Sequence, residues 1–333
     1  MTLRIGMAGT GWFANVHAQL LNAMDGVQVT AVCGTSRDKA DLFAAKLGGA
    51  AGYADFTEML DGETLDAVYI CVPPSSHGTM EEQLIERGIP FLVEKPLDAG
   101  IEKPRRIAAM LEEKPLITSV GYHLRYRDTA NRLREALKLG TVGMLSGEWM
   151  GNFVNNAWWP KQERSGGQFV EQTTHIVDLL RYTAGEVAEV YAAYAQRHVH
   201  TKYDQVSVDD VGTVVLKLRS GAVASLSNTC LLPDGVFEAG LKAYTPDGLW
   251  NWSMEELRHT ATGQLTTIVK DQGNPYEAEN AAFIQAVRTG DASLIRSDYS
   301  DALKTQEVTV AALESARSGK PVLLQGETAG AVL

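Results

Sequence analysis

The sequence predicts an α/β fold in which a doubly wound parallel sheet is followed by an α+β domain with a large, open, mainly antiparallel sheet. Two observations support this prediction. Up to residue 121, short apolar runs alternate with segments in which apolar residues recur every three or four positions. Beyond residue 122, apolar runs are joined by short turns such as Arg219-Ser220-Gly221, which are typical of antiparallel hairpins. We therefore expect one domain at residues 1–121 and a second at 122–333.

The elements of the first domain are predicted from its apolar periodicity. Its strands are expected at Leu3 to Ala8, Val27 to Cys33, Leu65 to Val72, Phe91 to Glu94 and Leu116 to Gly121. The segments between them are amphipathic, and the first has its apolar face on Val16, Leu20 and Met24. Repeated β-α-β units give a parallel sheet covered by helices on both faces, with ligands beyond the carboxyl ends of its strands.

The second domain begins with helices and continues as a sheet. Helices are expected at Thr129 to Leu139, Gly167 to Thr183, Pro275 to Thr289 and Ser300 to Ser318. Strands are expected at Val187 to His198, Val211 to Leu218, Ala222 to Thr229, Phe237 to Tyr244, Leu257 to Ala261 and Leu265 to Val269. Helices then cover only one face of the sheet. We expect the other face to pair with a second copy in a homodimer or homotetramer, and plain solvent exposure is the alternative.

Composition argues against several classes of partner. The 333 residues carry a net charge of −11, so the chain lacks the basic surplus with which proteins bind nucleic acid or an anionic membrane. Its three cysteines, Cys33, Cys71 and Cys230, form neither a CxxC pair nor a metal-ligand cluster, so we expect no metal. No run approaches the roughly 20 apolar residues of a membrane span, and the first residues do not resemble a signal peptide. We expect a cytoplasmic protein.

A glycine-rich turn directly follows the first strand. It comprises Gly9, Thr10, Gly11, Trp12, Phe13 and Ala14, a GxGxxA pattern that opens the first helix. Glycines there let the backbone approach a pyrophosphate at the helix N-terminus, which predicts a Rossmann dinucleotide-binding domain. A plain tight turn is the alternative, but the position at the first strand-helix junction favours cofactor binding.

The end of the second strand bears on the choice of cofactor. NAD-binding domains commonly carry a carboxylate here that binds the ribose 2′-hydroxyl. This chain has Thr35, Ser36 and Arg37 instead, whose hydroxyls and guanidinium suit a 2′-phosphate. We therefore predict NADP, with NAD as the other possibility. In the alternative interpretation Ser36 is a helix N-cap and Arg37 a solvated residue of the first turn.

Further polar groups stand where the next strands end. Cys71, Pro73, Pro74 and His77 follow one strand, and Glu94 and Lys95 follow the next. Because the carboxyl ends of parallel strands meet at one edge of a sheet, we expect all of these residues near the cofactor. In the alternatives Glu94 and Lys95 form a surface ion pair and His77 is a polar helix cap.

A two-glycine segment in the second domain leads into a helix with a carboxylate and an imidazole. Glu171 and His175 lie four residues apart, which places them on one helical face. The carboxylate can orient the imidazole and stabilise its protonated form, as a general base requires. An ordinary helix pair is the alternative.

Other polar and aromatic residues are candidates for the substrate site. Tyr122 and Arg125 follow the last strand of the first domain, where they line the substrate cleft or stack at the domain boundary. Asn152 and Trp158 belong to a loop whose composition suits carbohydrate contacts, and Trp158 suits a wall of the nicotinamide site. Packing in the core or between subunits is the alternative for the tryptophan.

Four segments together resemble the Gfo/Idh/MocA family of oxidoreductases: GTGWFA, VPPSSH, EKPL and SGGQFVEQTTHIVDLLRYTAG. The resemblance spans the whole chain. It implies a Rossmann domain, a second domain with a large open sheet, and oxidation of a secondary hydroxyl of a sugar or cyclitol with NAD or NADP. It also implies that Lys95 is the catalytic lysine and that His175 is the acid/base residue. The family's usual aspartate is Glu171 here, which is one methylene longer.

The expected reaction holds a secondary alcohol of a carbohydrate or polyol between Lys95 and His175. His175 removes the hydroxyl proton while hydride leaves for the cofactor, Lys95 hydrogen-bonds the same oxygen, and Glu171 orients the imidazole. Two other functions compete with this one. In the first, a retained NAD supports transient oxidation, as in some glycosidases and lyases. In the second, the chain is a nucleotide-sensing regulator without turnover.

Overall fold

The computed structural model describes residues 2–324 and divides into two compact units. Of the described residues, the first unit holds 2–98, Glu102–Tyr126 and Asn274–Leu303, and the second holds Ala99–Ile101, Arg127–Gly273 and 304–324. The units therefore do not follow a single boundary at residue 121. Residues 274–303, which we expected in the second domain, pack with the first unit, because Phe283 and Ile284 are buried in its core.

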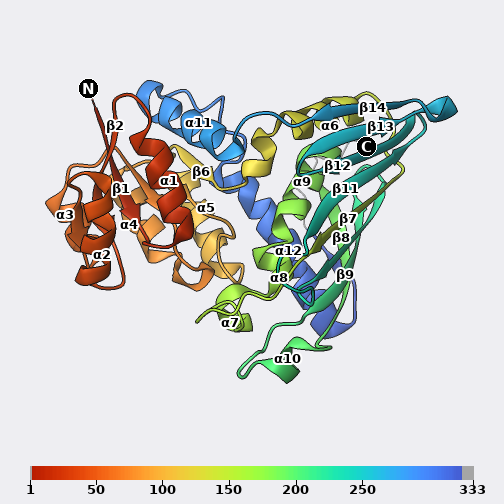
Figure 1. Ribbon diagram of the computed structural model, residues 1–333, viewed down its shortest axis with the longest axis horizontal. Coiled ribbons are helices and arrows are strands. Elements are labelled where there is room, and N and C mark those ends of the chain that lie inside the picture. Colours follow the sequence, from red (N-terminus) through yellow and green to blue (C-terminus); the bar gives the residue numbers. More distant parts are fainter. Residues whose placement is uncertain (1, 325–333) are drawn as a thin grey trace. The chain divides into compact units, whose positions relative to one another are not determined.

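A six-stranded parallel sheet forms the centre of the first unit (Figure 1). Its strands follow the order β3-β2-β1-β4-β5-β6. Its strands are β1 (Leu3–Ala8), β2 (Val27–Cys33), β3 (Ala51–Tyr53), β4 (Ala67–Ile70), β5 (Phe91–Val93) and β6 (Thr118–Val120). The strand order reverses between β1 and β4, and such a reversal opens a crevice at the carboxyl ends of the strands. The predicted doubly wound sheet is confirmed.

Helices cover both faces of this sheet. They are α1 (Trp12–Asn22), α2 (Arg37–Ala44), α3 (Phe56–Gly62), α4 (Thr79–Arg87), α5 (Glu102–Glu113) and α11 (Pro275–Thr289). Tyr69 packs with Leu21 of α1 and Phe283 of α11, whereas its neighbour Ile70 packs with Ile107 of α5. Successive side chains of a strand point to opposite faces, so each strand contributes to two separate cores.

The second unit contains a nine-stranded sheet in the order β14-β13-β12-β11-β7-β10-β9-β8-β15 (Figure 1). Its strands are β7 (Met144–Met150), β8 (Val187–Ala195), β9 (Val211–Leu218), β10 (Val223–Thr229), β11 (Glu238–Thr245), β12 (Gly248–Ser253), β13 (Glu256–Thr260), β14 (Thr266–Lys270) and β15 (Val322–Leu323). All neighbours pair antiparallel except β7 and β10. This confirms the predicted open, mainly antiparallel sheet.

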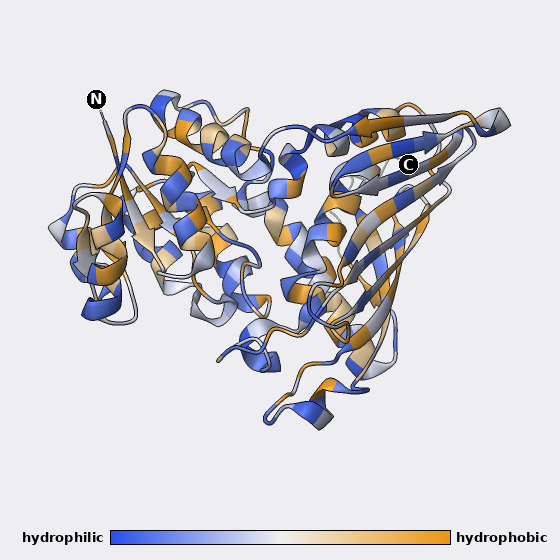
Figure 2. Ribbon diagram, in the orientation of Figure 1, coloured by the Kyte–Doolittle hydropathy of each residue, from blue (hydrophilic) through white to orange (hydrophobic). Residues whose placement is uncertain are grey.

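The strands of this sheet have one buried and one exposed face. Figure 2 shows hydrophobic and hydrophilic residues alternating along them. The helices of the unit are α6 (Asp128–Lys138), α7 (Gln162–Ser165), α8 (Gln168–Glu171), α9 (Thr174–Ala184), α10 (Val199–Lys202) and α12 (Tyr299–Ser318), which begins in the first unit. Val214 and Leu216 of β9 are buried, whereas Val215 between them is 48% exposed. Within residues 2–324, every helix is too short or too polar to cross a membrane.

Candidate active site

The glycine loop after β1 closes against the end of β4. Gly9 has a φ of +115°, and a Cβ there would lie 2.2 Å from the carbonyl oxygen of Cys71, so only glycine fits. α1 begins directly after Gly11, with no acidic residue in its first turn and no side-chain cap. Its first N–H groups are therefore available to an anion. The loop has the geometry that pyrophosphate binding requires.

The other predicted cofactor residues at these two strand ends differ in their exposure. Ala14 and Pro74 are buried, Thr10, Phe13, Cys71 and Pro73 are partly buried, and Trp12 is exposed. Trp12 makes an edge-to-face contact with Phe13, with ring centroids 4.6 Å apart. The indole thus stands at the surface beside the N-terminus of α1, where it can contact a bound nucleotide.

The segment after β2 forms a hydrogen-bonded cluster at the start of α2. Ser36 Oγ accepts from the backbone N–H of Lys39 at 3.3 Å, so Ser36 caps the helix. Arg37 Nε lies 3.0 Å from Asp41, in a pair whose side chains are 65% and 50% exposed. Both features match the alternative interpretation of this segment. Lys39, which the sequence analysis did not single out, donates from Nζ to Thr35 Oγ1 at 3.1 Å and adds a second cation.

His77 is the buried partner of an acidic residue at the start of α4. Its Nδ1 lies 2.7 Å from Glu81 Oε1, and the N–H of Gly78 donates to Glu81 Oε2 at 2.7 Å. Burial acts to raise the pKa of Glu81, but His77 and the backbone N–H groups outweigh burial and lower it below 4.5. This contact matches the alternative interpretation of His77 as a polar partner of the helix start, and its contact with a cofactor stays a prediction.

A buried polar cluster lies where β5 ends. Glu94 is 5% exposed and Lys95 is 9% exposed, so the two are not a surface ion pair. Glu94 Oε1 lies 2.9 Å from Nε2 of His17 on α1, and His17 Nδ1 lies 3.0 Å from Oδ1 of Asn280 on α11. The sequence analysis missed His17 and Asn280. The sequence did contain a signal for His17, because this polar residue lies on the same face of α1 as the apolar Ala14 and Leu21, which are buried.

The predicted helix over Gly167 to Thr183 is broken into α8 and α9, so Glu171 and His175 do not belong to one continuous helix. The carbonyl oxygen of Gln168 accepts from the N–H groups of both Gln172 and Thr173, at 2.8 Å and 2.9 Å. These bonds close α8 directly after Glu171, and α9 begins at Thr174. Glu171 therefore ends one short helix and His175 lies in the first turn of the next.

Two tryptophans hold the acidic and imidazole side chains of this segment. Trp159 Nε1 donates to Glu171 Oε2 at 2.7 Å, and Trp159 is 1% exposed. The ring of His175 stacks on Trp149 of β7, with centroids 5.4 Å apart and planes inclined by 22°. The sequence analysis did not single out Trp149. The orientation of His175 by Glu171 stays a prediction.

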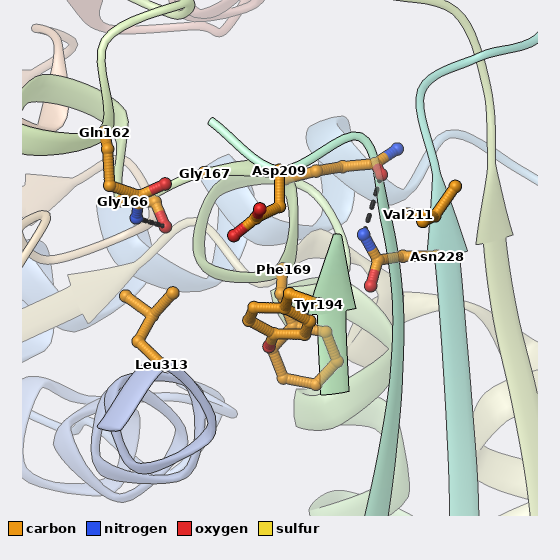
Figure 3. Close-up of a pocket in the computed structure, with 10 residues that line it drawn as sticks. Gln162, Gly166, Gly167, Phe169, Tyr194, Asp209, Val211, Asn228 and Leu313 are labelled. Atoms are coloured by element: carbon orange, nitrogen blue, oxygen red, sulfur yellow. Dashed lines mark hydrogen bonds between the residues drawn. The ribbon is translucent and has the colours of Figure 1, made fainter. Parts of the chain in front are cut away.

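A small cavity beside the two-glycine turn shows what supports α8 (Figure 3). Gln162 Nε2 donates to the carbonyl oxygen of Gly166 at 2.6 Å, and Asn228 Nδ2 donates to Gln168 Oε1 at 2.8 Å (dashed in Figure 3). The rings of Phe169 and Tyr194 lie 6.0 Å apart in the same cavity. The residues that line it do not include the predicted catalytic groups. We interpret these hydrogen bonds as support for the turn that leads into α8 and Glu171.

The remaining predicted substrate residues lie in packed or partly buried places. Tyr122 is 1% exposed within the core of the first unit. Arg125 is 3% exposed and its Nη2 lies 2.6 Å from Asp301 Oδ2 in the same unit. This ion pair favours a structural role for Arg125. Asn152 and Trp158 are partly buried, and Trp158 packs against the cluster around Trp159.

Comparisons with known proteins find similarity to one family of oxidoreductases in both units. A model of an oxidoreductase family with an NAD-binding Rossmann fold matches residues 3–122, and a model of the GFO/IDH/MocA C-terminal domain matches residues 128–243. Myo-inositol 2-dehydrogenase of Thermotoga maritima is 24% identical over 98% of this chain and 91% of its own length. Scyllo-inositol 2-dehydrogenase (NAD(+)) of Bacillus subtilis is 26% identical over 97% and 96%. The structure of levoglucosan dehydrogenase with NADH and levoglucosan has a TM-score of 0.87 at 18% identity, covering 98% of this chain and 100% of that one.

Proposed function

This chain belongs to the Gfo/Idh/MocA family of oxidoreductases, and from that premise we propose that it moves hydride between a nicotinamide cofactor and a secondary alcohol of a sugar or cyclitol. The chain is an NAD(P)-dependent dehydrogenase, and what we propose is the class of its substrate. The observation that carries it is the buried Glu94-Lys95 pair at the carboxyl end of β5, in the same unit as the glycine loop. The relatives named for inositol oxidation support a cyclitol or sugar.

The residues around the glycine loop fit a dinucleotide. Gly9 leaves the space that a Cβ would fill, and the N-terminus of α1 offers N–H groups to a pyrophosphate. When bound, the nicotinamide accepts or donates the hydride. In the mechanism that we propose, His175 takes the proton from the substrate hydroxyl, Lys95 stabilises the charge that develops on the same oxygen, and Glu171 orients the imidazole.

We propose NADP rather than NAD as the preferred cofactor. Lys39 Nζ donates to the hydroxyl of Thr35, and Arg37 follows the capping Ser36 in the first turn of the same helix. The ion pair of Arg37 with Asp41 is exposed and weak, so the guanidinium can exchange this partner for a phosphate. Dissociation constants for NADPH and NADH should differ by about tenfold or more in favour of NADPH, from one added charge-assisted contact. A preference for NADH would contradict the proposal.

We propose that copies of the chain pair through the exposed face of the second sheet. Tyr191, Val215, Val223 and Tyr244 on this face are between 40% and 48% exposed, although they are apolar or aromatic. Such a patch is typical of a subunit interface. Light scattering should give a dimer or tetramer for the wild type and a smaller species for Val215→Lys. A monomeric wild type would exclude pairing.

A substrate panel tests the function directly. Sugars, inositols and their keto forms are incubated with oxidised or reduced cofactor, and the absorbance of the reduced nicotinamide is followed. We expect turnover of at least one cyclitol or sugar, and Lys95→Met, which removes the ammonium but keeps an unbranched side chain, should abolish it. A wild type that binds NADPH but turns over no member of the panel would refute the substrate class.

A further inference from the structure

We propose that His17 is a positioning residue for this reaction: an imidazolium that holds the Glu94 carboxylate and, through it, the peptide that carries Lys95. The proposal rests on the proposed function, in which Lys95 contacts the substrate. His17 is fully buried on α1, and it links the end of β5 to α11 through Glu94 and Asn280. The proposed roles of His175, Lys95 and Glu171 do not involve it.

The protonation of His17 follows from its neighbours. Asn280 Nδ2 donates to the carbonyl oxygen of Tyr276 at 2.6 Å, so the atom that Asn280 turns to His17 is its carbonyl oxygen. Nδ1 of His17 therefore carries a proton. In our proposal Glu94 is ionised. Its carboxylate then only accepts hydrogen bonds, so the Nε2 atom that faces it at 2.9 Å carries a proton as well. Both nitrogens of the ring then donate, which makes it a cation.

The three residues His17, Glu94 and Glu279 form one buried cluster, in which one ligand atom from each lies within 4.8 Å of the others. In our proposal this cluster acts as a buried ion pair.

Two buried carboxylates lie close to the ring of His17. Glu279 is fully buried and Glu94 nearly so, and an oxygen of each lies within 4.8 Å of a ring nitrogen of His17. Other titratable groups nearby include Tyr69, whose ring centroid lies 5.3 Å away, Tyr276 at 6.5 Å, and Cys71. Tyr126 lies close enough for the charge of Glu279 to act on it, and His123 stacks on Tyr276. Burial, followed by the charges of Glu94 and Glu279, raises the pKa of the Cys71 thiol well above 9.0, so the thiol stays neutral beside the cluster.

The contacts of Glu94 explain how His17 reaches Lys95. The N–H of Glu94 donates to the carbonyl oxygen of Ile70 at 2.9 Å, so the sheet pairing continues to the residue before Lys95. A Cβ at Gly121 would lie 2.8 Å from the carboxyl carbon and both oxygens of Glu94, so this carboxylate fills the space that a side chain would take. Backbone, glycine and imidazole together fix Glu94. Loss of the imidazole leaves a buried carboxylate without its charged donor, and the carboxylate must move and shift the peptide of Lys95 with it.

The first test compares His17→Gln with His200→Gln, because His200 is an exposed histidine of α10. Glutamine keeps one N–H donor but carries no charge. We expect kcat/KM of His17→Gln to fall by about 10²-fold, mostly through kcat, the size that a misplacement of about 1 Å produces. The dissociation constant for the cofactor and the turnover of His200→Gln should stay near wild type. Wild-type turnover of a folded His17→Gln would overturn the proposal.

A second pair of variants separates positioning from simple stability. Asn280→Asp keeps the acceptor and adds a negative charge that holds the imidazolium proton to higher pH, whereas Asn280→Leu removes the acceptor. We therefore expect the alkaline limb of kcat/KM to move up in the first variant and down in the second. A purely structural role changes the melting temperature without opposite shifts of the pH profile, and shifts in the same direction, or none, would overturn the proposal. This pair decides the matter if His17→Gln does not fold.

A spectroscopic test needs no turnover. The chain has seven histidines, and ¹⁵N labelling of histidine with the His17→Gln spectrum as reference identifies the signals of His17. Both ring nitrogens should carry protons at neutral pH. A neutral His17 in an enzyme with normal turnover would overturn this inference and leave the proposed function intact. No turnover with any substrate would instead refute the proposed function, and with it a role for His17 in the reaction.

Discussion

Asp210 should contribute more to the stability of the second unit than any other single carboxylate of its loop. The side chain is 1% exposed and accepts from the backbone N–H groups of Arg197, His198 and Val199, each at 2.7 Å. A hydrogen bond to a charged group contributes about 1.5–3 kcal/mol. The substitution Asp210→Asn keeps one acceptor oxygen but turns an amide NH₂ group toward the remaining donors.

The expected loss follows from these three bonds. At least one N–H group loses its acceptor and the others lose the charge, so we expect Asp210→Asn to lower the free energy of unfolding by about 2–4 kcal/mol. Asp209→Asn is the matched control. Burial, followed by the charge of Asp210, raises the pKa of Asp209, so its ionised form is disfavoured in the folded protein. The control should be as stable as the wild type or slightly more stable.

The two aspartates also predict opposite pH dependences. Burial acts to raise the pKa of Asp210, but the three N–H groups lower it below 3.8, so its stabilisation is present above that pH and is lost as the pH falls through the folded pKa. The destabilisation from ionised Asp209 is present at neutral pH and disappears on acidification.

Thermal and urea unfolding at neutral and acidic pH measure both effects. Asp210→Asn should melt roughly 5–10 °C below the wild type at neutral pH, and the gap should narrow in acid. The reasoning is refuted if Asp209→Asn and Asp210→Asn lose the same stability, or if the gap for Asp210→Asn does not depend on pH.

Three further substitutions test the active site. His175→Ala should lower kcat/KM by about 10²–10⁴-fold with little change in NADPH affinity, because it removes the proposed base, and wild-type turnover would exclude that role. Trp159→Phe removes the indole donor to Glu171. It should lower kcat/KM by about tenfold, which corresponds to an activation free energy raised by roughly 1.4 kcal/mol, and leave the cofactor affinity unchanged. An unaltered kcat/KM would show that this hydrogen bond is dispensable. Gly9→Ala places a Cβ against the Cys71 carbonyl oxygen and should weaken NADPH binding in a titration by about tenfold or more, whereas wild-type affinity would contradict the tight loop.

Periodicity located the regular elements of both sheets well. β1, β2, β9 and α11 have the bounds that their apolar patterns predicted. Their burial follows one repeat along the element, and such a repeat is visible in the residues themselves. β7 and β12 were missed, because Gly147 and Asn251 interrupt their apolar residues, and sheet neighbours rather than an apolar repeat keep these segments extended.

The break between α8 and α9 was hidden for the opposite reason. Apolar residues continue at helical spacing from Phe169 to Ile176, and both are buried. The pattern therefore predicted one helix. The carbonyl oxygen of Gln168 ends α8 by accepting two N–H groups, while Gln168 Nε2 donates to the carbonyl oxygen of Thr229 on β10. Because β10 is distant in the sequence, the residues around Gln168 gave no local indication that the helix breaks there.

Residue types alone were sufficient for the glycine loop, because a φ of +115° at Gly9 and an open helix start depend on backbone freedom at a few adjacent positions. The same holds for β1, β2 and β9, whose bounds follow from local repeats. The partners of the polar side chains required the folded chain. His17 and Asn280 are separated by 263 positions, and Glu171 accepts from Trp159, which lies outside the helix that carries Glu171. A buried hydrogen bond joins whichever donor and acceptor packing brings within about 3 Å, and that distance is a property of the fold as a whole.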